Sequence, residues 1–208
     1  VYKRQGIALK NKGDLEAAID SFKQALKIKP DYTDAHYNIG AALDERGDLE
    51  AAIDSYKQAL KINPNFAKAY YNIGSLLQKK GDPELAIDSY KLALKAKPDY
   101  AEAYNNMGNA LRNKGDVVAA IVSFKKALKI KPDYANAYNN MGNALQDGGD
   151  VEAAISSYQE ALKINPNYAK AYNNMAVLLE NNGHAKAAIE NYQEALKIKP
   201  DYAEAHYN

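Results

Sequence analysis

Apolar residues recur three and four positions apart along the whole chain, in segments separated by short polar turns. In the segment 49–62 the apolar residues are Leu49, Ala52, Ile53, Tyr56, Ala59, Leu60 and Ile62. This spacing places them on one side of a helix, so the segment is predicted to be one amphipathic helix. The segment 33–46 repeats the pattern, with Ala35, Ile39, Ala42 and Leu43 opposite Asn38, Ala41, Asp44 and Glu45. Together the two segments predict a helix, a turn and a second helix.

This helical unit returns every 34 residues. Its period is marked by Pro30, Pro64, Pro98, Pro132, Pro166 and Pro200, and by Gly13, Gly47, Gly81, Gly115, Gly149 and Gly183. A repeat of this length and regularity predicts a stack of near-identical hairpins in which each unit contacts its neighbours. We therefore expect an all-α, right-handed α-solenoid of stacked helix-turn-helix hairpins, with no strand.

The expected solenoid spans residues 1–208 as a single domain. Its units are a partial first one at 1–32, then 33–66, 67–100, 101–134, 135–168 and 169–202, and a truncated seventh at 203–208. Residues 1–5 break the pattern and resemble the translation of a sequencing-library adapter, so we expect a non-native scar there. The alternative is a degenerate first helix.

The turns carry the residues that helix ends require. Gly47 lies where the first helix of a unit ends, and the chain needs a left-handed residue at that point. Asp48 follows it and is predicted to cap the second helix, as are Asp82, Asp116 and Asp150. Pro83 occupies the first position of a predicted helix, where a missing N–H costs nothing. These residues support the predicted boundaries.

The repeat resembles a known family. Counting a unit from Thr33, its characteristic positions hold His36, Ile39, Gly40, Leu43, Ala52, Tyr56, Ala59 and Pro64. Units that start at Ala67, Ala101, Ala135 and Ala169 repeat them, with Tyr70, Tyr104, Tyr138 and Tyr172 at the aromatic site. Over essentially the whole chain this pattern resembles the tetratricopeptide repeat. One departure is Ala176, which stands where other units have glycine. The family uses a small residue there, so we expect alanine to be tolerated.

The resemblance implies a concave groove lined by the first helix of each unit. It implies ligand contacts at several positions of the unit, the fifth, sixth and ninth among them. The sixth position is Asn38, Asn72, Asn106, Asn140, Asn174 and Asn208. The fifth position adds Tyr37, Tyr71, Asn105, Asn139 and Asn173, and the ninth adds Asn109 and Asn143. The expected peptide-binding groove is therefore rich in amides and poor in charge.

An asparagine side chain can pair with both the N–H and the C=O of an extended peptide bond. A row of asparagines is therefore expected to bind peptide backbone with little sequence preference. The row resembles the asparagine ladder in the repeat domain of protein O-GlcNAc transferases, which holds polypeptides in extended form. The alternative is a role for these asparagines within the scaffold itself.

A second binding mode of the family, the carboxylate clamp for chaperone C-termini, fits less well. The best alignment supplies Asn109, Asn140 and Lys170, but Asn105 and Asn174 stand where the mode requires cations. A carboxylate would then gain neutral hydrogen bonds, roughly half as strong as charge-assisted ones. We therefore rank this mode low.

Other kinds of chemistry have little support in the sequence. There is no cysteine for disulfides, redox motifs or thiolate metal sites. The net charge is +1 and the lysines are spread over the helix ends, which argues against a nucleic-acid partner. No apolar run reaches the length of about 18 residues that a membrane helix needs. The histidines (His36, His184, His206) are scattered, and the recurrent serines (Ser21, Ser55, Ser89, Ser123, Ser157) have no His–Asp partners.

Two functions of different class remain. The first is a non-catalytic scaffold that binds a protein or an extended peptide in the groove. The second is the substrate-recognition arm of a larger enzyme, such as an O-GlcNAc-transferase-like glycosyltransferase. Under either function we expect residues 1–208 to contain no catalytic, metal or cofactor site. We also expect a cytoplasmic location and no membrane partner.

Overall fold

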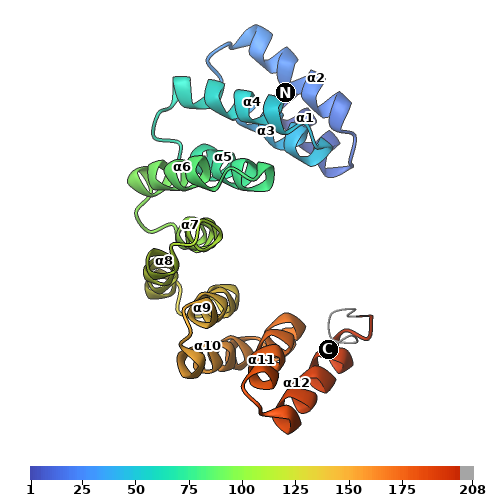
Figure 1. Cartoon of the computed structure of the whole chain (residues 1–208). Coiled ribbons are helices and arrows are strands. Elements are labelled where there is room, and N and C mark those ends of the chain that lie inside the picture. Colours follow the sequence, from blue (N-terminus) through green and yellow to red (C-terminus); the bar gives the residue numbers. More distant parts are fainter. Residues whose placement is uncertain (202–208) are drawn as a thin grey trace. The chain divides into compact units, whose positions relative to one another are not determined.

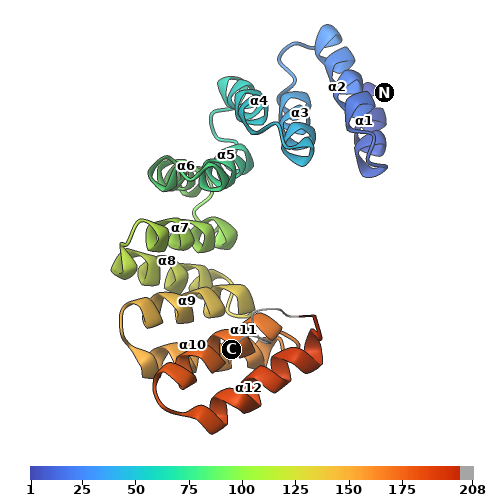
Figure 2. The ribbon, with the colours of Figure 1, turned by 45° about the vertical axis from the view of Figure 1, so that its right-hand side comes forward.

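A computed structural model describes residues 1–201, and this part of the chain consists of helices and turns without strands. The helices are α1 (Tyr2–Asn11), α2 (Leu15–Ile28), α3 (Thr33–Arg46), α4 (Leu49–Ile62), α5 (Ala67–Lys80), α6 (Pro83–Ala96), α7 (Ala101–Asn113), α8 (Val117–Ile130), α9 (Ala135–Asp147), α10 (Val151–Ile164), α11 (Ala169–Asn181) and α12 (Ala185–Ile198). Each odd-numbered helix forms a hairpin with the even-numbered helix that follows it, and the two lie side by side (Figures 1 and 2). We call the odd-numbered member of each hairpin its first helix and the even-numbered member its second helix.

The chain divides into two compact units, Val1–Asp99 and Tyr100–Asn208. Unit 1 contains the hairpins α1/α2, α3/α4 and α5/α6, and unit 2 contains α7/α8, α9/α10 and α11/α12. Within each unit the second helix of one hairpin packs against the first helix of the next. The predicted all-α solenoid of stacked hairpins is confirmed in this sense. The predicted seventh repeat, with Asn208, lies outside the described residues.

The glycine turns are as expected. Gly47 has a φ of 95°, and all six glycines of the 34-residue period have a positive φ. The aspartate caps are confirmed in part. The side chains of Asp116 and Asp150 accept a hydrogen bond from the helix N–H three residues on, whereas Asp48 and Asp82 form no such bond. The Asp48 carboxylate instead accepts a hydrogen bond from Arg46 Nε, at 2.6 Å.

Small residues allow the two helices of a hairpin to pack closely. A Cβ atom added to Gly108 would lie 2.6 Å from the ring of Phe124. Ala176 takes the equivalent place in the last hairpin and is fully buried against Tyr192. Tyr192 keeps 7% of its surface exposed, whereas Tyr158, which faces a glycine, has none. The alanine is therefore accommodated, with a slightly more exposed ring opposite it.

Residues 2–5 belong to the first helix, because α1 begins at Tyr2. Lys3 Nζ donates a hydrogen bond to Asp34 Oδ2 on α3, at 2.5 Å. The positive charge of the lysine therefore lies next to the first turn of the following first helix.

Candidate functional site: the faces of the first helices

The first helices of unit 1 line a hollow of about 510 Å³. Its lining residues are Lys3, Ile7, Asp34, Tyr37, Asn38, Phe66, Ala67 and Lys68. The rings of Tyr37 and Phe66 pack with their centroids 4.9 Å apart. Unit 1 therefore offers an aromatic and apolar surface bordered by charges of both signs.

The first helices of unit 2 line a hollow of about 350 Å³ with a different surface. Its lining residues are Arg112, Asn143, Gln146, Asp147, Lys170, Asn174 and Val177. Arg112 Nε donates a hydrogen bond to Asp147 Oδ2 at 2.5 Å, so these two charges compensate each other. The hollow is therefore mostly polar, with Lys170 as a further cation.

The fifth-position residues do not all lie where the resemblance placed them. Tyr37 and Tyr71 are half-buried on the first-helix face of unit 1. Asn105, Asn139 and Asn173 lie in the interior of unit 2, with exposed fractions of 5%, 0% and 6%. These three amides are below the surface that a ligand would touch.

The buried amides of unit 2 bind the sixth-position amides of the next repeat. Asn140 Nδ2 donates to Asn105 Oδ1 at 3.0 Å, and Asn174 Nδ2 donates to Asn139 Oδ1 at 3.1 Å. Within one repeat, Asn105 Nδ2 donates to Asn106 Oδ1 at 3.1 Å. Each link between repeats joins residues 35 positions apart. The asparagines of unit 2 therefore form a hydrogen-bonded network that joins successive hairpins.

The two ninth-position asparagines differ in their hydrogen bonds, because the second helix of one hairpin carries a tyrosine where the other carries a phenylalanine. Asn143 Oδ1 accepts a hydrogen bond from Asn174 Nδ2 at 3.0 Å. It also shares the single hydroxyl hydrogen of Tyr158 with Gln146 Oε1, the two acceptors lying 2.8 Å and 3.0 Å from Tyr158 Oη. The residue equivalent to Tyr158 in the preceding hairpin is Phe124, which has no hydroxyl group. Asn109, which follows the Gly108 that faces the Phe124 ring, is half-buried and has no hydrogen bond to the described side chains. Its amide is therefore available to a ligand.

In unit 1, phenol groups take the place of the buried amides. Asn72 Nδ2 donates to Tyr37 Oη at 3.1 Å and to Tyr56 Oη at 3.2 Å. Burial raises the pKa of Tyr56 above the ordinary tyrosine value, which already leaves the hydroxyl protonated at neutral pH. Asn38 Nδ2 donates to the backbone oxygen of Asp34 on its own helix, at 2.7 Å. The amide hydrogens of Asn72 are therefore both used within the scaffold.

Three of the sixth-position asparagines retain acceptor oxygens for a ligand. Asn38, Asn72 and Asn174 are half-buried, and their Oδ1 atoms accept no hydrogen bond from the described residues. Simultaneous pairing with the N–H and the C=O of a peptide, expected from the sequence, is not open to Asn72 or Asn174 in this arrangement. Asn173 Oδ1 is buried and also lacks a partner among the described residues. Asn208, which follows it at the same 35-residue interval, lies outside them.

One set of hydrogen bonds was not predicted from the sequence. The tyrosine of a second helix donates its hydroxyl hydrogen toward a polar residue near the end of the first helix, twelve positions earlier. The pairs are Tyr90 with Gln78 at 3.1 Å, Tyr158 with Gln146 at 3.0 Å and Tyr192 with Glu180 at 2.8 Å. Their constant spacing is a signal that would have identified them.

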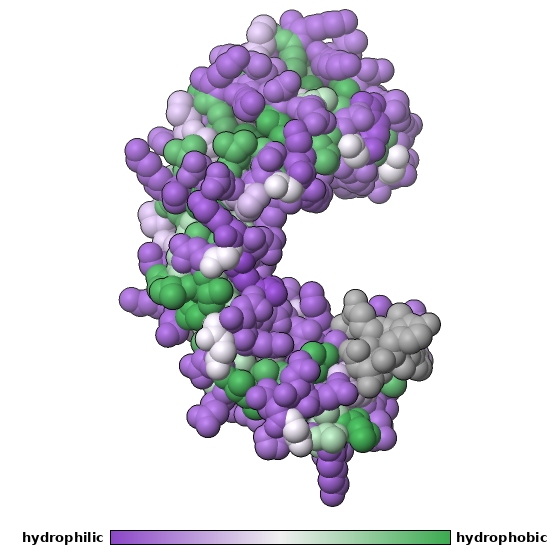
Figure 3. All heavy atoms as spheres, viewed as in Figure 1, coloured by the Kyte–Doolittle hydropathy of each residue, from purple (hydrophilic) through white to green (hydrophobic). Residues whose placement is uncertain are grey.

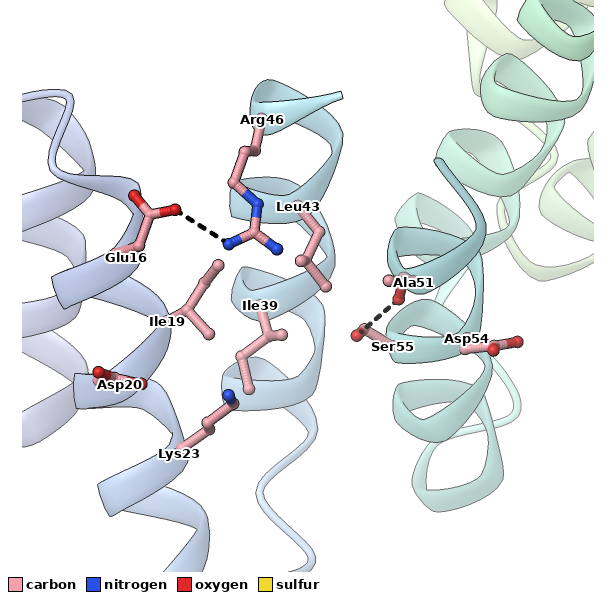
Figure 4. Close-up of a pocket in the computed structure, with 10 residues that line it drawn as sticks. All are labelled: Glu16, Ile19, Asp20, Lys23, Ile39, Leu43, Arg46, Ala51, Asp54 and Ser55. Atoms are coloured by element: carbon pink, nitrogen blue, oxygen red, sulfur yellow. Dashed lines mark hydrogen bonds and ion pairs between the residues drawn. The ribbon is translucent and has the colours of Figure 1, made fainter. Parts of the chain in front are cut away.

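A further hollow, of about 430 Å³, lies among α2, α3 and α4 of unit 1 (Figure 4). Its apolar part is formed by Ile19, Ile39 and Leu43, and Glu16 forms an ion pair with Arg46 at 3.1 Å. Ser55 donates its hydroxyl hydrogen to the backbone oxygen of Ala51. Ser89 and Ser157 do the same on their own helices, which supports a structural role for these recurrent serines.

Two further properties of the described residues bear on function. They contain no group of three or more His, Cys, Asp or Glu side chains placed to hold a metal ion. None of the described helices is long and apolar enough to cross a membrane.

Family models match most of the sequence. One, described as "TPR repeat", matches residues 6–44, 43–81, 108–149, 143–183 and 185–208. Two models described as "Tetratricopeptide repeat" match residues 67–100 and 89–122. The chain belongs to the tetratricopeptide repeat family. The resemblance inferred from the repeat pattern is therefore confirmed.

Solved structures of similar fold include MamA, YrrB and PilW. The similarity to MamA has 29% identity and a TM-score of 0.71, and covers 80% of this chain and 97% of MamA. YrrB, described as a TPR protein with an unusual peptide-binding site, has 23% identity, a TM-score of 0.70 and coverages of 89% and 96%. PilW, described as a type IV pilus biogenesis factor, has 21% identity, a TM-score of 0.86 and coverages of 99% and 96%. No curated protein sequence matches the chain significantly.

Proposed function

We propose that this tetratricopeptide repeat chain is a non-catalytic scaffold whose first-helix faces bind extended segments of partner proteins. The proposal rests on which helices line the two hollows. Each is lined by first helices of successive hairpins within a single unit, and the hollow of unit 1 also includes Phe66 at the start of α5. An extended segment crossing such helices would meet each hairpin in turn.

The half-buried side chains of these faces supply the contacts. The Oδ1 atoms of Asn38, Asn72 and Asn174 accept hydrogen bonds from peptide N–H groups, and Asn109 both donates and accepts. In unit 1, Tyr37 and Tyr71 provide apolar contact for ligand side chains. Asn140 is also half-buried on the first helices of unit 2.

The buried Asn105, Asn139 and Asn173 act differently in this proposal. They hold the sixth-position amides in place and do not touch the ligand. Because the acceptor atoms are already held in place, the protein loses little conformational entropy on binding. The entropy lost by the flexible peptide still opposes binding. The expected affinity is roughly micromolar, with modest preference for ligand sequence.

The similarity to YrrB, described as having a peptide-binding site, is consistent with this proposal and shows the fold alone. The proposal holds for a free-standing scaffold and for the recognition arm of a larger enzyme. In both cases the binding surface belongs to the repeats themselves.

The proposal is tested with an array of unstructured synthetic peptides, followed by calorimetric titration of those that bind. Asn38→Trp fills the hollow of unit 1 and Val177→Trp fills the hollow of unit 2. The matched control is Gln58→Trp, which adds the same bulk to the exposed surface of the second helix α4.

Each hollow-filling variant should weaken the peptides of its own unit about tenfold or more, a loss of about 1.4 kcal/mol. The control should bind like the parent protein. If no peptide binds, or if the hollow-filling variants bind as well as the control, the first-helix faces are not the binding surface.

A further inference from the structure

The second helices of unit 1 carry a regular stripe of charges on the side that faces solvent. In unit 1 it reads Glu16, Asp20, Lys23 and Lys27 on α2; Glu50, Asp54, Lys57 and Lys61 on α4; and Glu84, Asp88, Lys91 and Lys95 on α6. In α8 the same four positions are Val118, Val122, Lys125 and Lys129. The two acidic residues are replaced by valines and the two lysines are kept.

Both valines are open to solvent. Val118 is 76% exposed and Val122 is 49% exposed, and they stand one helical turn apart. In Figure 3 an apolar patch lies over α8 on the visible face of unit 2. Apolar side chains gathered in this way, with polar neighbours, are typical of surfaces that bind other proteins.

The substitution of the acids also leaves the lysines of α8 without ion pairs. In α4 and α6 the aspartate of the stripe pairs with the lysine three residues on, Asp54 with Lys57 at 3.9 Å and Asp88 with Lys91 at 3.0 Å. Lys125 and Lys129 form no ion pair or hydrogen bond with the described residues.

No acidic residue lies within α8 itself, which has three lysines. The third, Lys126, lies over the ring of Tyr104, with Nζ 5.6 Å from the centroid. The helix is therefore positively charged beside its exposed valines, whereas α2, α4 and α6 each balance two acids against two lysines.

We propose that the stripe formed by Val118, Val122, Lys125 and Lys129 is a docking site for an acidic amphipathic helix of a partner protein. Two apolar side chains one turn apart on the partner would cover the valines. Acidic side chains farther along would pair with Lys125 and Lys129. This site is on a second helix and is separate from the first-helix faces proposed to bind peptides.

The charge and apolar area of the stripe favour an acidic helix over two other partners, a second copy of the chain and an anionic membrane. A second copy of the chain would bring the same lysines against these lysines, and like charges in contact oppose binding. An anionic membrane would satisfy the lysines, but membrane-surface helices bury a much larger apolar face than two valines. An acidic helix complements both the apolar and the basic part.

The probe is a fluorescent, terminally blocked helical peptide with two leucines four residues apart, followed by glutamates three and seven residues beyond the second leucine. Its control has lysines in place of the glutamates. Binding to the intact chain is measured by anisotropy. The variant V118E/V122D restores the stripe of α2 and α4, so it is expected to fold like those helices. Circular dichroism checks that it does.

The acidic peptide should bind the parent chain, and more weakly as salt screens the lysines. V118E/V122D should weaken binding about tenfold or more, because it adds like charges to the site. K125E/K129E should transfer the preference to the lysine peptide. E50V/D54V creates the same stripe on α4 and should add a second site for the acidic peptide.

The proposal fails if V118E/V122D binds the acidic peptide as well as the parent, or if both peptides bind equally. It also fails if ultracentrifugation shows self-association that V118E/V122D abolishes, since a second copy then covers the stripe. Binding to phosphatidylserine vesicles without binding to the acidic peptide would likewise overturn it.

Discussion

Units 1 and 2 use the same repeat positions but satisfy their polar groups differently. In α3 and α5 of unit 1 the fifth position holds tyrosines, and the amide of Asn72 donates to the phenol oxygens of Tyr37 and Tyr56. In unit 2 the fifth position holds asparagines, and the amide of Asn174 donates to Asn139 and Asn143. Asn72 and Asn174, both at the sixth position, thus donate to side chains of the preceding hairpin. The fifth-position residue of that hairpin supplies one of the two acceptors, a phenol oxygen in unit 1 and an amide oxygen in unit 2, and makes the face aromatic or amide-lined.

The largest loss of stability is expected from overpacking a hairpin of unit 2. Ala120 is fully buried beside Phe124 and Ala144, so Ala120→Leu should destabilise the protein by about 3 kcal/mol. Because repeats contact only their neighbours, hydrogen exchange should accelerate most in α7 to α10. If both the melting temperature and the exchange rates stayed unchanged, the assignment of this contact would be wrong.

The next effect concerns the amide network of unit 2. Asn139→Ala removes the buried acceptor of Asn174 and leaves polar groups unpaired, at a cost of about 1–3 kcal/mol. Asn109→Ala is the matched control, because Asn109 takes no part in the network, and it should change stability by less than about 0.5 kcal/mol. Urea denaturation measures both. Equal effects of the two substitutions would remove the distinction between scaffold and ligand-facing asparagines.

A third prediction contrasts the tyrosine hydroxyls. Tyr56 accepts a hydrogen bond from an amide, whereas Tyr192 donates one to the Glu180 carboxylate. Burial, with this bond to Glu180, raises the pKa of Tyr192 to about 12. The unfolded chain therefore loses the proton first, near pH 10. The stability linked to Tyr192 is present below that pH and falls by about 1.4 kcal/mol per pH unit between about pH 10 and 12.

Tyr192→Phe should remove this part of the alkaline loss of stability. The free energy of unfolding in urea, measured at about pH 9, 10 and 11, gives the slope for the variant and the parent. Parallel slopes would show that Tyr192 is not the group responsible.

The smallest loss of stability is expected from a substitution of Tyr37. Tyr37→Phe removes one acceptor of Asn72 but leaves Tyr56 in place, so it should cost only about 0.5–1.5 kcal/mol. It keeps the ring contacts with Tyr56 and Phe66. A cost larger than that of Asn139→Ala would reverse the comparison between the two units.

The fold was predictable because each helix end is marked by a local signal. Gly47 adopts the left-handed conformation that its place in the repeat required, and Pro83 begins a helix. Asp48 shows the limit of such signals, since a nearby arginine competes for its carboxylate.

The candidate site was predictable only in part. Asn105 and Asn106 are adjacent in sequence, but a helix turns by about 100° per residue, so one is buried while the other is half-buried. The partners of these amides are 35 residues away. The sequence therefore indicates the row of asparagines, whereas the division between scaffold and ligand-facing atoms depends on how the hairpins pack.

The central claim is that the scaffold holds the amide hydrogens of Asn72 and Asn174 and leaves their oxygens for the ligand. Nuclear magnetic resonance of the side-chain carboxamides tests it most directly, with the exposed Asn113 as an internal reference. The carboxamide protons of Asn72 and Asn174 should exchange more slowly than those of Asn113, and a bound peptide should shift their Cγ resonances while this protection remains. Exchange as fast as that of Asn113, or Cγ resonances that a bound peptide leaves unchanged, would contradict the claim.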